Sequence, residues 1–207
     1  MANPVEQQSD EQDLITSAQG GDLNAFNALV LRYQDNVYGV TYRIMGEADS
    51  AADTAQDTFI TAFRRLETYR GGNFKAWLLR IATNTCYDEL RRRKRRPADA
   101  LDDLPGADHA DGPPLPSYDP SPEQHVQQHE LQRIIENCIK ALRDEQRLVI
   151  ILRDIEGLSY DEVAASAGVP AGTVKSRLSR ARASMRACLQ NFQELLPDTY
   201  RLTHSDD

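Results

Sequence analysis

The sequence contains 207 residues, of which 40% are hydrophobic and 27% are charged, and its formal net charge is −8. This composition is typical of a soluble globular protein and excludes a largely disordered chain. The longest apolar run, "LVIIL", is far shorter than the roughly 20 residues of a membrane-spanning helix. The N-terminal residues also lack the basic and apolar regions of a signal peptide. We therefore expect a soluble cytoplasmic protein with no direct membrane insertion.

The three cysteines, Cys86, Cys138 and Cys188, are far apart in the sequence. Such spacing predicts no disulfide framework. We expect three free thiols, as is usual in a reducing cytoplasm.

Charge is distributed very unevenly along the chain. Residues 61–96 carry a net charge of +8 and residues 171–190 carry +5, although the whole chain is acidic. Between these two basic blocks, residues 97–124 contain seven acidic residues and no lysine or arginine. This alternation indicates separate surfaces for separate partners.

The N-terminal part of the chain has helical periodicity throughout. A first amphipathic pattern, "DLNAFNALVLRYQDNVYGVTYRIMG", stops at Gly46, a typical helix C-terminal signal. A second predicted helix spans about residues 50–66, and a third spans about residues 74–96, after the break at Gly71 and Gly72. The apolar stripe expected on the second helix consists of Ala52, Ala55, Phe59, Ala62, Phe63 and Leu66.

An acidic segment divides the chain into two units. The stretch "PADALDDLPGADHADGPPLPSYDPSPE" is rich in Pro, Asp and Gly and has no helical or strand periodicity. Because proline removes backbone donors and like charges repel, this composition predicts an extended, flexible linker. We therefore predict an all-α protein of two small helical domains, residues 10–96 and 126–190, with a linker at 97–125 and a C-terminal tail at 191–207.

The C-terminal unit has the pattern of a helix-turn-helix. Ser159 and Glu162 form a capping box that starts a short helix, Gly168 suits the tight turn, and Pro170 leads into a second helix. On that second helix one face is apolar, and the opposite face consists of small residues flanked by cations. The apolar face consists of Val174, Leu178, Ala181, Met185 and Cys188, and the small residues are Gly172, Ser176, Ser179 and Ala183. A small ridge with basic flanks fits a DNA major groove, with the cations reaching phosphates.

Two stretches resemble bacterial sigma factors of the extracytoplasmic-function (ECF) type, group 4 of the sigma-70 family. "DEQRLVIILRDIEGLSYDEVAASAGVPAGTVKSRLSRARASMR" resembles region 4 of that family, and "GTVKSRLSRAR" is its most specific part. "DTAQDTFITAFRRLETYRGGNFKAWLLRIATNTCYDELRRRKRR" resembles region 2. The two matches occur in the family order and cover roughly residues 10–190. The resemblance implies a transcription initiation factor that binds core RNA polymerase and directs it to promoters by recognising the −10 and −35 elements and assisting DNA melting.

The resemblance also assigns site residues. The expected contacts with core polymerase are Asp53, Gln56 and Asp57. The expected −10 DNA contacts are Thr68, Tyr69, Arg70, Gly72, Asn73, Phe74, Lys75, Arg80, Asn84, Arg91 and Arg92. Within this set, residues 68–73 would capture a flipped base, and Trp77 is expected nearer the core than the DNA. The expected −35 contacts are Thr173, Lys175, Ser176, Ser179 and Arg180, with Arg177 and Arg182 gripping phosphates.

Further partners follow from the same resemblance. An anti-sigma factor is expected, as is common in this family. The acidic linker is expected to pass through the polymerase cleft, where its acids either mimic nucleic acid or serve only as a tether.

Other classes of function account for less of the sequence. A stand-alone helix-turn-helix repressor or activator would explain the C-terminal unit but leave the N-terminal one unused. A metal site would use His125 and His129, four residues apart, but no third ligand is evident. No spacing supports a nuclease, and no P-loop, GxSxG or HExxH motif occurs. We expect no enzyme activity, no cofactor, no metal and no small-molecule substrate.

Overall fold

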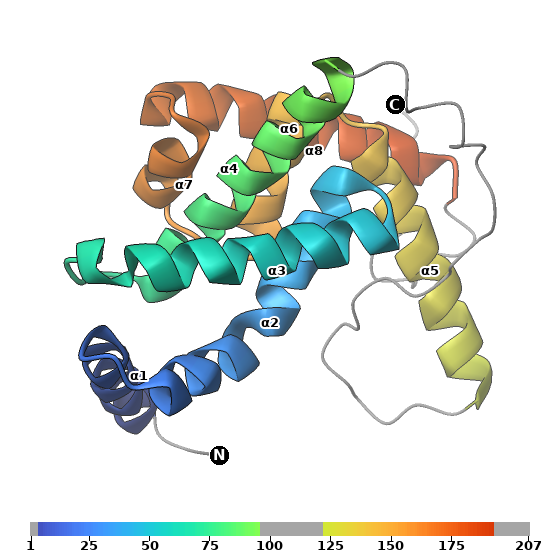
Figure 1. The fold of residues 1–207 in the computed structure, drawn as a ribbon. Helices are drawn as coiled ribbons and strands as arrows, with labels where there is room; N and C mark the ends of the chain where they lie inside the picture. Colours follow the sequence, from blue (N-terminus) through green and yellow to red (C-terminus); the bar gives the residue numbers. More distant parts are fainter. Residues whose placement is uncertain (1–3, 96–121, 193–207) are drawn as a thin grey trace.

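The protein is built from helices (Figure 1). The structure, a computed structural model, describes residues 4–95 and 122–192, with side chains described over 10–95 and 130–192. These ranges contain eight α-helices, two short helical turns and no strand, which confirms the all-α prediction. The elements are α1 (Pro4–Gln19), α2 (Leu23–Met45), α3 (Ala48–Arg65), η1 (Leu66–Thr68), α4 (Phe74–Arg95), α5 (Pro122–Lys140), α6 (Asp144–Ile150), the π-helical turn η3 (Ile151–Ile155), α7 (Tyr160–Ala167) and α8 (Ala171–Gln190). None of the helices in these ranges is long and apolar enough to cross a membrane.

The N-terminal domain is a bundle in which α2, α3 and α4 pack against one another and α1 packs on α2. Its core comes mainly from α2 and α4, and includes the buried side chains of Leu29, Val37, Val40, Leu78, Leu79 and Ala82. Burying one such leucine or valine stabilises the fold by about 1.5–3 kcal/mol. The core therefore fixes α4, the helix that carries the second half of the predicted −10 surface.

The buried stripe of α3 differs from the prediction. Ala52 is exposed and Phe63 is 42% exposed, whereas Thr54 and Thr58 are buried. Each threonine hydroxyl donates a hydrogen bond to a backbone carbonyl one turn earlier, at 2.6 Å for Thr54 and 2.7 Å for Thr58. Because these bonds satisfy the hydroxyls, threonine can occupy core positions that the apolar pattern assigned to other residues.

The ends of three helices follow the predicted signals. Gly46 ends α2, and Ser159 and Glu162 form the complete capping box at the start of α7. Gly168 ends α7 with φ of 65°, in the left-handed region where a side chain would be strained. Its turn leads to α8, which begins directly after Pro170. The predicted helix-turn-helix is therefore formed by α7 and α8.

The C-terminal domain packs α8 against α5, α6 and α7. Val174, Leu178 and Ala181 of α8 are buried, as the predicted apolar face requires. The apolar run that begins at Leu148 forms the end of α6 and the start of η3, and all five of its side chains are buried. Helix α8 is therefore fixed on its inner face by a continuous apolar core.

The expectation of three free thiols is wrong. Cys138 of α5 and Cys188 of α8 form a disulfide, with their Cα atoms 5.8 Å apart. Only Cys86 is free, and it is buried in the N-terminal domain. The two bonded cysteines are 50 residues apart in sequence, so their proximity depends on the packing of α5 beside α8.

The two domains pack against each other. Helix α4 packs against α3 of its own domain and against α7 of the C-terminal domain, and the three helices can be followed in Figure 1. Arg43 of α2 and Glu136 of α5 form a buried ion pair between the domains, with a 2.8 Å contact, and Lys140 lies over the ring of Tyr42. The α5 helix begins at Pro122, within the range assigned to the linker. The rest of that linker and nearly all of the C-terminal tail lie outside the described residues.

Thiol counting tests the disulfide. Burial raises the pKa of the Cys86 thiol to about 12, so this group remains a poorly reactive neutral thiol at pH 8. We expect no alkylation of the native, non-reduced protein, one alkylated cysteine after denaturation, and three after reduction and denaturation, each counted by mass spectrometry. Three alkylated cysteines without reductant would contradict the Cys138–Cys188 bond.

The same bond should contribute measurably to stability. It closes a sequence separation of 50 residues, for which the chain-entropy model gives about 4 kcal/mol of stabilisation. Urea unfolding of the C-terminal domain should therefore occur at lower urea in Cys188→Ser than in the oxidised parent. Cys86→Ser keeps the disulfide and serves as the control. Reductant should move the unfolding of this variant to lower urea, as it does for the parent.

Candidate nucleic-acid and protein interfaces

The outer surface of α8 has the form predicted for groove binding. Gly172, Ser176, Ser179 and Ala183 are all exposed, opposite the buried face of the helix. The Ser176 hydroxyl donates a 2.9 Å hydrogen bond to the carbonyl of Thr173, so its oxygen stays available as an acceptor. The ridge therefore presents small groups that allow a close approach to base edges.

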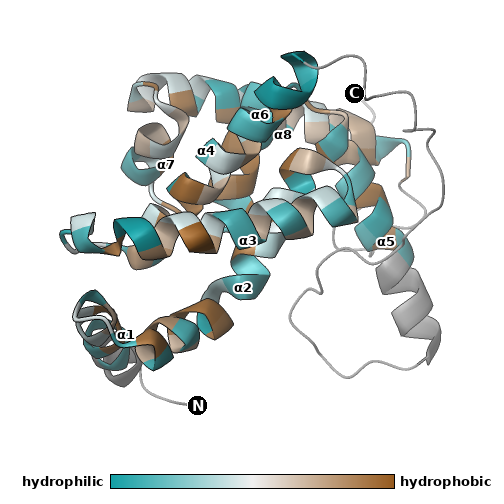
Figure 2. Ribbon diagram, viewed as in Figure 1, coloured by the Kyte–Doolittle hydropathy of each residue, from teal (hydrophilic) through white to brown (hydrophobic). Residues whose placement is uncertain are grey.

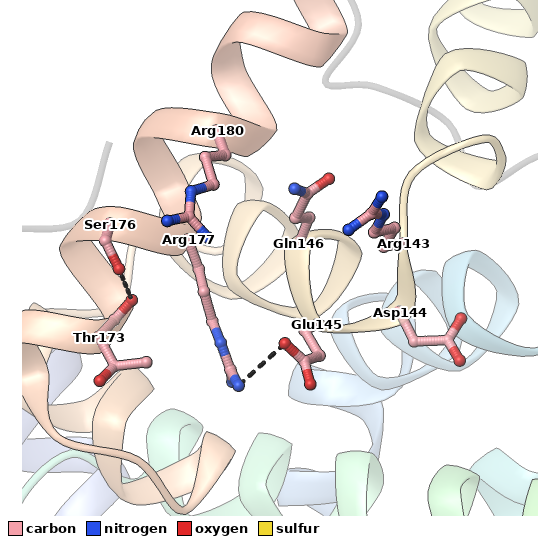
Figure 3. Close-up of a pocket in the computed structure, with 8 residues that line it drawn as sticks. All are labelled: Arg143, Asp144, Glu145, Gln146, Thr173, Ser176, Arg177 and Arg180. Carbon is pink, nitrogen blue, oxygen red and sulfur yellow. Dashed lines mark hydrogen bonds and ion pairs between the residues drawn. The ribbon is translucent and has the colours of Figure 1, made fainter.

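A polar pocket of about 550 Å³ lies between the start of α8 and the start of α6 (Figure 3). Its lining residues are Arg143, Asp144, Glu145, Gln146, Thr173, Ser176, Arg177 and Arg180. Sequence reasoning missed Arg143 and Gln146, because nothing in the spacing places the start of α6 beside α8. Their arrangement extends the polar surface beside α8 to the start of α6, where Arg143 adds one cation.

The cations of α8 differ in their partners. Arg177 forms a 2.9 Å ion pair with Glu145, and Arg182 forms a two-bond ion pair with Asp154, at 2.6 and 2.9 Å. Within the described residues, Lys175, Arg180 and Arg186 form no ion pair, although Lys175 lies over the ring of Tyr160 at 5.6 Å. As far as the described residues show, a DNA phosphate would meet three cations without a carboxylate partner, whereas Arg177 and Arg182 must first release Glu145 and Asp154.

A glycine loop, residues 68–73, joins η1 to α4. Gly71 and Gly72 have φ of 93° and 98°, values that side-chain-bearing residues rarely adopt. The hydroxyl of Tyr69 donates a 2.7 Å hydrogen bond to the Gly72 carbonyl, which closes the loop. From α1, the Gln19 amide donates to the carbonyls of Leu66 and Tyr69 at 3.0 and 3.1 Å. The loop is thus fixed at both ends, and Gln19 is a positioning residue that the sequence did not reveal.

Two predicted −10 contacts, Tyr69 and Phe74, are buried in this structure. Tyr69 is 5% exposed and Phe74 is 1% exposed, and with Trp77 they form an aromatic cluster with ring centroids 5.3–5.4 Å apart. Such edge-on and tilted pairs stabilise packing. In this structure Tyr69 and Phe74 therefore support the glycine loop from inside rather than offering a face to a base. The expectation that Trp77 lies near the core agrees with its partial burial against it.

The remaining −10 residues are arranged around the loop and along α4. Thr68, Arg70, Gly72, Asn73, Arg80 and Asn84 are exposed. Lys75 is only partly exposed, because its ammonium forms a 2.9 Å ion pair with Glu156 of the C-terminal domain. The polar side of the site is therefore exposed except at Lys75.

The basic run at the end of α4 is partly neutralised by neighbouring acids. Its residues give the hydrophilic colour at the end of α4 in Figure 2. Arg91 pairs with Asp88 at 3.0 Å, and Arg92 pairs with Glu89 at 2.7 Å. The hydrogen bond from Arg92 is the largest cause that lowers the pKa of Glu89. Arg91 and Arg92 are exposed and could exchange these partners for phosphates.

One exposed face of α3 carries the predicted polymerase contacts. Asp53, Gln56 and Asp57 are all exposed and point away from the bundle core. Ile60 lies one turn beyond Gln56 and Asp57 and is 41% exposed. The face is therefore acidic and polar with an apolar side chain at its end, a combination suited to a basic partner surface.

Among the residues whose side chains the structure describes, no group of three or more His, Cys, Asp or Glu side chains could hold a metal ion. His125 and His129 lie outside those side chains. The hypothesis of a metal site at these two histidines gains no support from the described part of the chain.

These features define a class, a DNA-binding transcription factor with a helix-turn-helix in one domain and a second basic surface in the other. Residues 29–96 match the family model of sigma-70 region 2, and residues 132–185 match the model of sigma-70 region 4. The chain therefore belongs to the sigma-70 family and is a promoter-directing RNA polymerase sigma factor of the ECF type. A stand-alone repressor or activator is not favoured, because it would not need region 2.

Similar proteins agree over most of the chain. The RNA polymerase sigma-H factor of Pseudomonas aeruginosa is 38% identical over 184 residues, covering 88% of this chain and 95% of the relative. The ECF RNA polymerase sigma-E factor of Escherichia coli K12 is 38% identical over 180 residues, covering 86% and 93%. Among solved structures, the sigma factor RpoE in complex with the anti-sigma factor NepR from Bartonella quintana matches with a TM-score of 0.64 and 28% identity, covering 81% of this chain and 98% of that one. CnrH in complex with the cytosolic domain of CnrY matches with a TM-score of 0.60 and 25% identity, covering 88% and 98%.

Ion pairing on α8 leads to a prediction about DNA affinity. Arg180→Ala should weaken promoter binding by about 1–3 kcal/mol, the usual range for losing a specific arginine contact. Arg182→Ala should cost less, because Arg182 must first release Asp154. Fluorescence anisotropy on a promoter duplex, with polymerase present, would compare them. A larger loss for Arg182→Ala would contradict this order.

The same pairing changes the expected salt dependence. Five phosphate contacts would give a slope of log affinity against log salt of about −4 to −5, whereas three uncompensated cations give about −3. Titration of the parent on a −35 duplex between low and moderate salt would measure this slope. A slope near zero would show that α8 makes no phosphate contacts.

Proposed function

We propose that the two basic surfaces recognise the two promoter elements separately. The −35 element is bound by the outer face of α8, through Thr173, Lys175, Ser176, Ser179 and Arg180. Arg177 and Arg182 contact phosphates after exchanging their carboxylate partners. Arg143 and Gln146 extend this surface across the pocket shown in Figure 3. The observation that supports this role best is the small, exposed ridge of α8 with three uncompensated cations beside it.

The −10 element is bound at the glycine loop and along α4. Unstacking a base during melting costs a few kcal/mol, and a protein must offer a pocket or polar groups that compensate. The exposed groups around the loop supply these contacts, and they are Thr68, Arg70, Gly72, Asn73, Lys75, Arg80 and Asn84. Arg91 and Arg92 contact the backbone farther along. Tyr69 and Phe74 maintain the loop conformation on which the contacts depend.

Core RNA polymerase docks on the exposed face of α3. Asp53 and Asp57 supply charge, Gln56 supplies hydrogen bonds, and Ile60 supplies apolar area. The protein acts in the cytoplasm as a transcription initiation factor and is not itself an enzyme. An anti-sigma factor is a further partner, in line with the two solved complexes that the chain resembles.

Transcript mapping would test the proposed function. The purified protein is mixed with core RNA polymerase and genomic DNA fragments, and the 5′ ends of transcripts are determined. Initiation at a discrete set of sites, absent with core alone, is the expected result, and alignment of these sites would identify both promoter elements. No new start sites and no binding to core would reject the proposal.

A charge reversal tests the α3 face. Asp57→Lys should weaken binding to core polymerase by about tenfold, or about 1.4 kcal/mol, since it removes one favourable charge contact and adds an unfavourable one. Asp13→Lys is the matched control, because Asp13 is exposed on α1 and the change in charge is identical. Equal core affinity for the two variants, measured by fluorescence titration, would place the polymerase contact elsewhere.

A further inference from the structure

A tyrosine of α7 lies beside the proposed −35 contact Lys175. Tyr160 is the first residue of α7, directly after the capping residue Ser159, and its side chain packs partly buried against the core. The ammonium of Lys175 lies over this ring, with its nitrogen 5.6 Å from the ring centroid. A cation within about 6 Å of an aromatic centroid is attracted by the negative face of the ring. Tyr160 therefore contacts the only lysine of α8.

A second cation holds the same ring. The guanidinium carbon of Arg153 lies 4.9 Å from the centroid of the Tyr160 ring. Arg153 is itself anchored, because its guanidinium donates a 2.6 Å hydrogen bond to the backbone carbonyl of the buried Leu158. Arg153 is partly buried, whereas Lys175 is exposed. The fold thus fixes the ring through one cation and leaves the other cation on it accessible to DNA.

The anchoring arginine belongs to the π-helical turn η3. In this turn the Glu156 amide donates to the Ile151 carbonyl, five residues earlier, at 2.9 Å. Such turns are rare and often occur at functional sites. The next residue after Arg153, Asp154, bonds the guanidinium of Arg182 twice. One turn of backbone therefore contacts α7 through Arg153 and α8 through Asp154.

Lys175 also stands at the edge of the exposed ridge of α8. Together with Tyr160 it lines a pocket of about 320 Å³, which includes Ser179 of the ridge and the cation of Arg186. Within the described residues Lys175 forms no ion pair, so its ammonium does not have to release a carboxylate before it contacts DNA. The ring therefore directs an available cation beside the small residues of the ridge.

Holding this lysine in advance lowers the cost of binding DNA. A lysine has a long, flexible side chain, which is among the most costly to order. When the side chain is already held over a ring, less conformational freedom remains to be lost on contact with DNA. The ring attracts the charge of the ammonium and does not consume its three N–H donors. Lys175 can therefore contact the ring and a base edge at the same time.

We propose that Tyr160 is a positioning residue that holds Lys175 in place for the −35 element, with Arg153 fixing the ring. The inference rests on the proposed −35 role of Lys175. It adds a residue of α7 that sets the direction of a DNA contact without making that contact itself. Because a fixed direction limits the base edges that the ammonium can reach, Tyr160 contributes to selectivity as well as to affinity.

A double-mutant cycle tests the positioning role. Tyr160→Leu removes the aromatic face but keeps an apolar side chain, and Tyr160→Phe keeps the ring. Each change is made in the parent, in Lys175→Met and in Arg180→Ala. Arg180 is the matched control, because it is also an exposed cation of α8 but lines a different pocket from Tyr160.

The full-length variants are assembled with core RNA polymerase and titrated by fluorescence anisotropy. The probes are a promoter duplex taken from the mapped start sites and the same duplex with each −35 base pair substituted in turn. Affinity for the first probe and discrimination against the others are measured together. Circular dichroism of each variant checks that α7 and α8 remain folded.

Tyr160→Leu should weaken binding to the promoter duplex by about two- to fivefold, the range of an exposed cation–π contact. It should also reduce discrimination at one −35 position by a similar factor, whereas Tyr160→Phe should bind as the parent does. In Lys175→Met the leucine change should have no further effect, and in Arg180→Ala it should cost the same factor as in the parent. A folding defect would reduce affinity in both backgrounds, so a loss that persists in Lys175→Met would overturn the inference.

The anchor provides a second measurement with the ring still in place. Arg153→Met should also weaken binding, and its effect should be smaller in Tyr160→Leu than in the parent, because both residues act through Lys175. Fully additive losses would show that Arg153 does not act through the ring.

Three further outcomes separate the inference from the function on which it rests. Tighter binding by Tyr160→Leu would overturn the inference, because the ring would then hold Lys175 away from DNA. Unchanged binding by Tyr160→Leu, with weaker binding by Lys175→Met, would remove the positioning role and leave the −35 role of Lys175 intact. Unchanged binding by Lys175→Met would refute that −35 role and the inference together.

Discussion

The position of α4 between two domains is the constraint on which the other features depend. Its side chains Leu78, Leu79, Ala82 and Cys86 are fully buried in the N-terminal core, and its first turn packs against the C-terminal domain. A helix buried on this much of its surface has only a narrow polar strip left. That strip carries Arg80 and Asn84, and its ends carry Lys75 and the basic run. The proposed −10 contacts and the packing of the two domains therefore share the same end of one helix.

Intramolecular acids determine which cations are available to DNA. Arg177, Arg182 and Arg92 each have a carboxylate partner at 2.6–2.9 Å, and exposed pairs of this kind contribute only about 0–1 kcal/mol. Exchange of such a partner for phosphate therefore costs little per residue. The exchange nevertheless reduces the net number of counterions released when DNA binds, because the carboxylate that loses its arginine takes up a cation from solution. A net charge of −8 is thus compatible with DNA binding. Acids such as Glu145 and Asp154 pair with cations of α8 but leave those cations on the surface, where a phosphate can replace the acid.

Local sequence signals predicted the elements well where the physics is local. The capping box of Ser159 and Glu162, the end of α2 at Gly46 and the buried face of α8 depend on residues within one or two turns. The errors occurred where distant segments meet. No spacing could bring Cys138 to Cys188, and none could show that Phe74 is buried against Tyr33 of α2, because tertiary packing decides both. The error in the predicted apolar stripe of α3 has a different cause. A search for apolar residues does not select threonine, yet Thr54 and Thr58 are buried with their hydroxyls bonded to their own helix.

The α5 helix connects these long-range contacts. Over little more than one turn it presents Glu136 and Lys140 to α2 of one domain, and Cys138 to α8 of the other. A covalent bond thus joins α5 to α8, whereas charge contacts join α5 to the N-terminal domain. Because a disulfide persists where an ion pair exchanges with solvent, the link from α5 to the C-terminal domain is the more durable of the two. Arg43 and Glu136 therefore hold α5 to the N-terminal domain, whereas Cys138 and Cys188 hold it within the C-terminal domain, and the two links differ in kind as well as in strength.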